Sequence, residues 1–116
     1  MENYITMIAR FDLHEGKLGE FKELFQKGIE AIKEKEPGVV NFNLYASADE
    51  RTVCSFETYK DSEAVLKHFE ISEKRMEKIL AISEVRRVDL YGPANQELKD
   101  FLSQFGTNFY ELAVGY

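Results

Sequence analysis

The sequence from Val39 to Tyr59, VVNFNLYASADERTVCSFETY, decides the fold of this chain. Residues 39–45 alternate in side-chain character with a period of two, which is typical of a β-strand. Residues 52–59 are rich in β-branched and aromatic side chains, and a short polar connection at residues 48–50 separates the two segments. The stretch therefore predicts an antiparallel hairpin in the middle of the chain.

A strand and a helix flank the hairpin on each side. Residues 4–13 alternate like a strand, and residues 18–32 carry apolar side chains at helical spacing. After the hairpin, residues 61–80 show a helical pattern with a break at Ile71-Ser72, and residues 85–91 form a last strand. The order predicts an α+β fold, a ferredoxin-like βαββαβ unit with an antiparallel sheet.

The chain continues beyond this unit in a C-terminal extension, residues 92–116. Apolar residues at helical spacing predict a further helix that ends at Gly106, and residues 107–116 have the pattern of an extended tail. No repeat or long linker divides the sequence. We therefore expect a single domain over residues 1–116, with a core at residues 4–91.

The predicted sheet carries large residues on both faces. On the first strand Tyr4 and Ile8 oppose Ile5 and Met7. The helices of the same chain can cover only one face, and a second apolar face in water favours aggregation. We therefore expect a homodimer that forms through the sheet face.

The composition excludes several classes of partner. The 116 residues have a net charge of −6, and no basic cluster is longer than Arg86-Arg87, which argues against nucleic-acid binding. No apolar run approaches the ~18 residues of a membrane span. Cys54 is the single cysteine, so no internal disulfide can form and a cytoplasmic location is expected.

Four segments occur in an order that is known from one protein family. In chain order they are Glu15-Gly16-Lys17, Glu36-Pro37-Gly38, Asn41–Tyr45, and Phe56–Asp61 with the following Ala64 and His68. This set resembles the antibiotic biosynthesis monooxygenase (ABM) domain family over residues 4–91. The resemblance implies a dimeric α+β barrel, in which two ferredoxin-like subunits pack sheet to sheet.

The resemblance also implies a range of activities. The family includes cofactor-independent monooxygenases that act on phenolic or quinol-like compounds, haem-degrading enzymes, small-molecule isomerases, and members with no known activity. Haem-degrading relatives use an Asn on the first strand, where this chain has Thr6 and Ile8, and Tyr59 stands at the position of a family Trp. These departures argue against haem degradation.

His68 is the candidate catalytic residue. An imidazole titrates near neutrality, as a general base that removes a phenolic proton must. The helical pattern places His68 at the margin of an apolar stripe, so the alternative is a structural histidine without chemistry. His14 lies in a polar turn and is expected at the surface.

Four further residues are candidates for substrate binding. Asn41, Asn43 and Tyr45 share one strand face, where the amides could hold a substrate oxygen or, alternatively, form hydrogen bonds across a subunit interface. Tyr59 could orient a bound ring, or could simply close the end of the sheet.

Other residue types point to no additional chemistry. Glu57 and Arg10 could form a cross-strand pair that has no chemical role. Cys54 has no neighbouring base in the sequence, and two separated histidines with one cysteine supply no metal-ligand set, so no metal and no cofactor are expected.

The leading interpretation is a small-molecule oxidoreductase, a cofactor-independent monooxygenase whose partner is a small apolar or aromatic ligand. Two alternatives stay open: a dimeric binding or structural module without turnover, and a proton-transfer isomerase on the same scaffold.

Overall fold

A computed structural model describes residues 3–116; Met1 and Glu2 of the expected domain lie outside the described residues. The elements are β1 (Ile5–Leu13), α1 (Leu18–Lys35), β2 (Val39–Ala46), β3 (Thr52–Tyr59), α2 (Ser62–Ile71), α3 (Glu73–Ala81), β4 (Ser83–Tyr91), α4 (Gln96–Leu102), a 3-10 turn η1 (Ser103–Phe105) and β5 (Asn108–Tyr110). The expected α+β fold with its C-terminal extension is confirmed.

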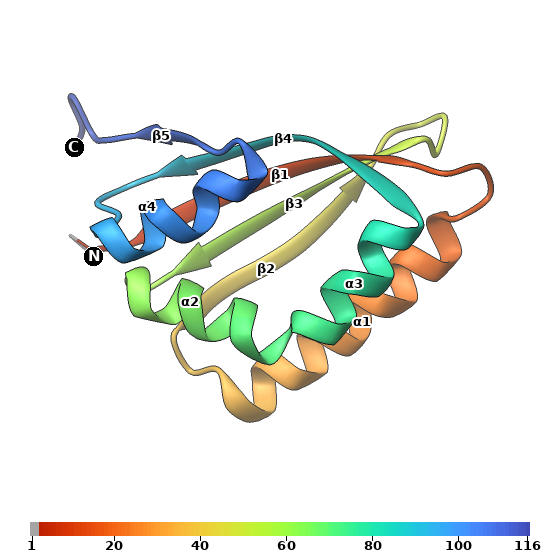
Figure 1. The fold of residues 1–116 in the computed structure, drawn as a ribbon, viewed down its shortest axis with the longest axis horizontal. Coiled ribbons are helices and arrows are strands. Elements are labelled where there is room, and N and C mark those ends of the chain that lie inside the picture. The colour runs from red at the N-terminus through yellow and green to blue at the C-terminus, as the bar shows by residue number, and fades with distance from the viewer. Residues whose placement is uncertain (1–2) are drawn as a thin grey trace.

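The five strands form one open sheet in the order β2-β3-β1-β4-β5. The β1–β3, β1–β4 and β2–β3 pairs are antiparallel, whereas β5 pairs with β4 in parallel. Because α4 carries the chain back along the sheet before β5 begins, the last strand runs in the same direction as β4 (Figure 1). The tail thus makes the sheet mixed.

The helices lie along one side of the sheet (Figure 1), and the hydrophobic core forms between the sheet and these helices. Strand alternation decides which side chains enter it: Ile5, Met7, Ala9 and Phe11 of β1 are buried, while the residues between them are more exposed. The facing helix α1 contributes its apolar stripe, which consists of Phe21, Leu24, Phe25 and Gly28.

Two of the helices, α2 and α4, begin at a residue whose side chain caps the helix N-terminus. The Asp61 carboxylate accepts a hydrogen bond from the backbone N–H of Ala64 at 2.9 Å, and the Asn95 side chain accepts one from Leu98 at 2.9 Å. Ser72 separates α2 from α3. The break indicated by the sequence at Ile71-Ser72 is therefore a real boundary between two helices.

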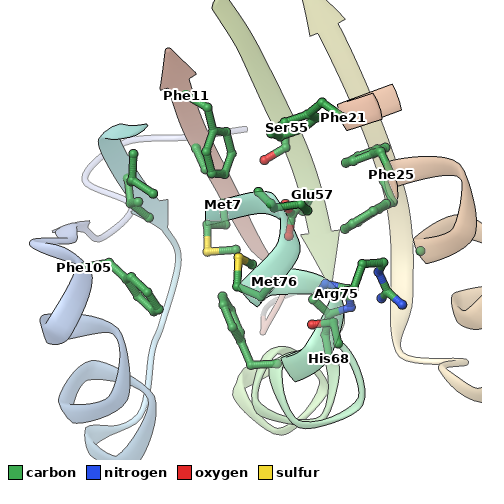
Figure 2. Close-up of a pocket in the computed structure, with 18 of the residues that line it drawn as sticks. Met7, Phe11, Phe21, Phe25, Ser55, Glu57, His68, Arg75, Met76 and Phe105 are labelled. Carbon is green, nitrogen blue, oxygen red and sulfur yellow. The ribbon is translucent and has the colours of Figure 1, made fainter. Parts of the chain in front are cut away.

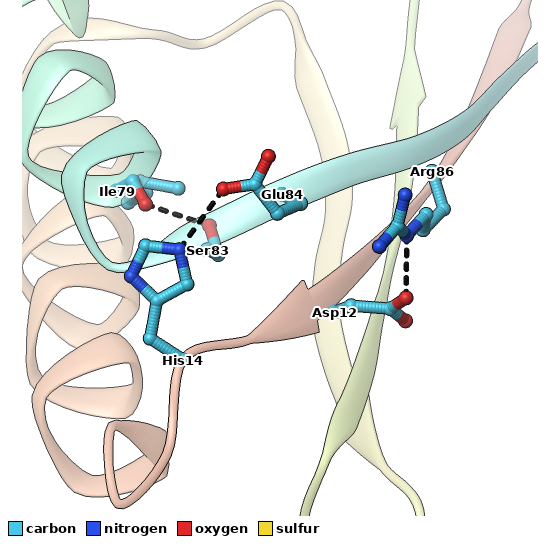
Figure 3. Close-up of polar contacts among 6 residues, drawn as sticks. All are labelled: Asp12, His14, Ile79, Ser83, Glu84 and Arg86. Atoms are coloured by element: carbon cyan, nitrogen blue, oxygen red, sulfur yellow. Dashed lines mark hydrogen bonds and ion pairs between the residues drawn. The ribbon is translucent and has the colours of Figure 1, made fainter.

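Two exposed ion pairs lie at the end of the sheet near the β1–α1 turn (Figure 3). His14 Nε2 lies 2.9 Å from a Glu84 carboxylate oxygen, so His14 is a surface residue, as expected. The Arg86 guanidinium donates to Asp12 on the neighbouring strand, and this hydrogen bond lowers the pKa of Asp12. Exposed pairs of this kind contribute little to stability.

The sheet face that the helices leave open carries exposed aromatic rings. Tyr45 and Phe56 meet edge to face at 5.2 Å between ring centroids, and Tyr91 and Tyr110 stack at 5.1 Å. All four side chains are at least 40 % exposed. The large apolar side chains expected on this second face are therefore present and uncovered in a single chain.

Replacing Gly92 by Ala is expected to destabilise the fold. Gly92 has a φ of +127°, and a Cβ atom there would lie 2.6 Å from the Tyr4 carbonyl oxygen. Gly106 also has a positive φ, of +66°, but its Cβ would meet nothing within 4 Å. In urea unfolding, Gly106→Ala should cost about 1 kcal/mol and Gly92→Ala at least about twice that. Equal losses would contradict the close approach of Gly92 to β1.

Candidate active site

A pocket of about 60 Å³ lies between the sheet and the helices (Figure 2). Its walls are mostly apolar and include Met7, Phe11, Phe25, Phe69, Met76 and Phe105. Polar side chains reach it from two sides: Ser55 and Glu57 from β3, and His68, Ser72 and Arg75 from the α2–α3 segment. A small apolar pocket with a few convergent polar groups is the usual form of a binding or active site.

His68 lines this pocket from α2 and is buried, with 4 % of its surface exposed. Its ring centroid lies 5.1 Å from that of Phe42 and 5.8 Å from that of Tyr59. The sequence placed His68 at the margin of the apolar stripe, and that detail is wrong. The end of α1 and the hairpin both cover α2 at this point, so the imidazole is enclosed.

A buried carboxylate orients the His68 ring. Glu36 Oε1 lies 2.8 Å from His68 Nδ1, and both side chains are almost completely buried. An ionised carboxylate can only accept a hydrogen bond, so Nδ1 donates and Nε2 of a neutral ring keeps its lone pair. Among residues 3–116, Nε2 has no hydrogen-bond partner. The arrangement has the geometry of a general base with its orienting acid.

Glu36 was not identified from the sequence as a site residue, although an acidic residue at the end of a helix indicates that a partner for its charge lies nearby. It follows the last residue of α1 as the C-cap, where the helix dipole disfavours a negative charge. A buried acidic residue at that position needs a compensating partner. His68, 32 residues later, is that partner.

A second hydrogen-bonded pair lies on β3. The Tyr59 hydroxyl donates to Glu57, and burial together with the charges of Glu57 and Glu36 raises the pKa of Tyr59 well above its ordinary value. Tyr59 is fully buried. Of the two residues of this pair, Glu57 lines the pocket and Tyr59 does not. The suggested Glu57–Arg10 pair is wrong: Glu57 lies opposite Met7 and faces the helices, whereas Arg10 points to the open face.

The unsatisfied polar atoms of the described residues gather at this one place. Four buried side-chain atoms lack a hydrogen-bond partner within residues 3–116: Glu36 Oε2, Ser55 Oγ, Ser72 Oγ and Arg75 Nη2. Three of these residues line the pocket, and Glu36 supports His68 from behind. Because native proteins leave few buried polar atoms unpaired, such a cluster indicates a site that receives a ligand or water.

Asn41, Asn43 and Tyr45 lie outside this pocket. On β2, Phe42 faces the helices, so its neighbours in the strand point to the open side of the sheet, where all three are exposed. The Asn43 amide donates to Asn41 at 3.2 Å. The structure therefore does not bring these residues together with His68, and the reading in which they line the same cavity is corrected.

The pocket suits proton transfer. His68 and Glu57 are titratable groups at its surface, and Arg75 supplies a positive charge. At about 60 Å³ it is smaller than the roughly 150 Å³ that holds benzene in a protein core, so an aromatic ligand has to displace flexible side chains such as Met7 and Met76.

Two further findings concern the described part of the chain. Within residues 3–116, no three His, Cys, Asp or Glu side chains come close enough together to hold a metal ion. None of the helices described there has the length and apolarity needed to cross a bilayer.

The fold is shared with several solved structures. MupZ from Pseudomonas fluorescens superposes with a TM-score of 0.84 at 20 % identity, over 98 % of this chain and 93 % of MupZ. A putative antibiotic biosynthesis monooxygenase from Nitrosomonas europaea gives 0.71 at 22 % identity, over 83 % and 95 % of the two chains. SnoaB from Streptomyces nogalater, a cofactor-independent oxygenase, gives 0.68 at 18 % identity, over 81 % and 96 %.

Sequence comparison adds the family. No curated protein matches the chain significantly. The family model for antibiotic biosynthesis monooxygenases, however, matches residues 4–73, which is more than half of the chain and includes Glu36, Glu57 and His68. The protein therefore belongs to the antibiotic biosynthesis monooxygenase family.

Proposed function

We propose that this protein is a cofactor-independent monooxygenase that acts on a phenolic or quinol-like compound. The observation that carries the proposal is the buried Glu36–His68 pair, whose free imidazole nitrogen belongs to a residue lining an apolar pocket. Family membership and the likeness to SnoaB support an oxygenase. The pair supplies the base that such a reaction requires.

The proposed reaction begins with proton transfer. His68 Nε2 takes the O–H proton of the substrate, and the Glu36 carboxylate stabilises the imidazolium that results. The phenolate has carbanion character at the ring carbon para to its oxygen, and this carbon bonds to dioxygen. Return of a proton gives a hydroperoxide, which loses water to leave a carbonyl group. One oxygen atom enters the product and the other leaves as water, so the four electrons come from the substrate.

The apolar walls support this chemistry by excluding water from the anion. Phe25, Phe69 and Phe105 line the pocket, and the ring of Phe69 packs against those of Phe101 and Phe105. The imidazole of His68 replaces part of the water that would otherwise solvate the anion. Leu102 and Phe105 also line the pocket, so the C-terminal extension contributes to its wall.

A proton-transfer isomerase is the second candidate, and Glu57 favours it. Its carboxyl group lines the same pocket as His68, from the opposite wall. An isomerase must remove a proton from one atom and return one to another, which two separate acid–base groups can do. The two functions differ in whether dioxygen is consumed.

Oxygen consumption with a phenolic substrate tests the proposal. With 1-naphthol, the expected product is 1,4-naphthoquinone with one O₂ used per turnover. His68→Gln should reduce the rate about 10²–10⁴-fold, since it removes the base but retains a polar side chain of similar size. Glu36→Gln should cause a smaller loss, because its amide oxygen still accepts from Nδ1 but no longer stabilises the imidazolium.

His14→Gln is the matched control, since the His14 side chain is exposed and pairs with Glu84 at the surface. It should keep the wild-type rate. Full oxygen uptake by His68→Gln would contradict the assignment of the base. Product formation from an enolisable ketone without oxygen uptake would favour the isomerase, and absence of any turnover by the wild type would favour a binding module.

We also propose that two copies associate through the open sheet face. Its exposed rings, Tyr45, Phe56, Tyr91 and Tyr110, would be covered by the same surface of a second chain. Asn41 and Asn43 would then form hydrogen bonds across the interface. The single free Cys54 fits the proposed cytoplasmic location, where thiols stay reduced.

Sedimentation of charged variants tests the interface. Phe56→Asp is expected to shift the protein towards monomer at micromolar concentration, because it puts a charge into a face that should bury more than ~1,000 Å². Leu80→Asp on α3 is the control, since Leu80 and Phe56 are similarly exposed, at 40 % and 41 %. The control should sediment as the wild type does. A monomeric wild type, or a Phe56→Asp dimer, would contradict the interface.

A further inference from the structure

Arg75 stands apart from the other arginines of the C-terminal half of the chain. Arg86 and Arg87 each form an ion pair with an aspartate near the surface. Arg75, on α3, lines the pocket, and its Nη2 atom is buried without a hydrogen-bond partner among residues 3–116. A buried guanidinium nitrogen that donates to nothing is costly in free energy. An acceptor brought by a ligand would remove that cost.

The fold makes room for the Arg75 side chain. It lies over Gly28 of α1, where an added Cβ atom would come within 3.1 Å of Arg75 Nε. Gly28 belongs to the buried stripe of α1, whose other members are large and apolar. The absence of a side chain at this position lets the guanidinium lie inside the molecule, beside the pocket wall (Figure 2).

The guanidinium keeps its charge in this setting. Burial lowers the pKa of Arg75, and the negative charge of Glu36 acts in the opposite direction. An arginine in a protein remains protonated even with a lowered pKa. The pocket thus holds a permanent positive charge and two unsatisfied hydroxyl groups, those of Ser55 and Ser72.

The charges around the pocket select the kind of oxygen that Arg75 can accept as a partner. Glu36 and Glu57 already place two carboxyl groups at or behind its walls. A ligand that arrives as a carboxylate would bring a third negative group into a poorly solvated site. A neutral ligand avoids this cost, since its oxygen becomes negative only when its proton moves to His68, and the total charge stays constant.

We propose that Arg75 Nη2 donates a hydrogen bond to the substrate oxygen that becomes negatively charged when His68 takes the proton. Arg75 is then a catalytic residue, and the substrate class is a neutral phenol or enolisable ketone rather than a carboxylic acid. This inference rests on the proposed function and adds to it the group that stabilises the anion. Preorganised donors at a developing oxyanion act strongly in a site with little water.

Binding of 4-nitrophenol under nitrogen tests the inference without turnover. The phenol and the phenolate differ in visible absorbance, so a pH titration gives the pKa of the bound probe. The wild type should bind the phenolate form, and Arg75→Met should raise the pKa of the bound probe by about one unit or more, a tenfold loss of preference for the anion. Arg75→Lys keeps the charge and should fall between the two.

Lys78→Met is the matched control, because it removes one positive charge from the exposed side of the same helix. It should titrate as the wild type does, and circular dichroism should show that each variant is folded. The inference is overturned if 4-nitrophenol does not bind the wild type, if Arg75→Met leaves the bound pKa unchanged, or if 4-nitrobenzoate binds more tightly than 4-nitrophenol through Arg75. An Arg75-dependent shift without oxygen uptake from 1-naphthol would contradict the monooxygenase and leave the role of Arg75 standing.

Discussion

The hydrogen bond between Glu36 and His68 is the interaction on which the site depends. It joins the C-cap of α1 to the last turn of α2, two positions that are 32 residues apart in the sequence. A buried carboxylate and a buried imidazole are costly in free energy unless they are hydrogen-bonded, and this bond pairs Glu36 Oε1 with His68 Nδ1. The pair therefore ties α2 to the end of α1 and orients the ring of His68, a residue that lines the pocket.

The sheet divides the molecule into two surfaces with different chemistry. On β3, Ser55 and Glu57 point to the helices and reach the pocket, while the alternating residues Cys54 and Phe56 point to the open face. One strand thus supplies both the polar floor of the proposed active site and part of the proposed subunit interface. A change of register by one residue would exchange the two sets.

Most of the fold could be predicted from the sequence, because local patterns of residues determine where its helices and strands begin and end. The alternation in residues 39–59, the caps and the break at Ile71-Ser72 each act over a few residues. His68 could be singled out for its chemistry. The parallel pairing of β5 and the burial of His68 could not, because both depend on where α4 and α1 lie in space.

The remaining site residues were hidden for a similar reason. Glu36 and Arg75 resemble the many charged residues that usually face solvent. Only the tertiary structure buries Glu36 against His68 of α2 and lays the partly buried Arg75 over Gly28 of α1. Asn41, Asn43 and Tyr45 were correctly placed on one strand face, but the sequence did not say which face would meet the helices. Phe42, which is partly buried and stacks on Phe25 of α1, shows which face of β2 meets the helices.

The central claim is that Glu36 holds the His68 ring so that its Nε2 lone pair faces the pocket. Nitrogen-15 NMR of the imidazole side chains tests this directly, since the chemical shifts of the two ring nitrogens report which one carries the proton in the neutral ring. The account predicts that His68 is protonated at Nδ1 alone, with slow exchange of that proton, while the exposed His14 exchanges freely. A neutral His68 protonated at Nε2, or one that averages between the two forms as His14 does, would contradict it.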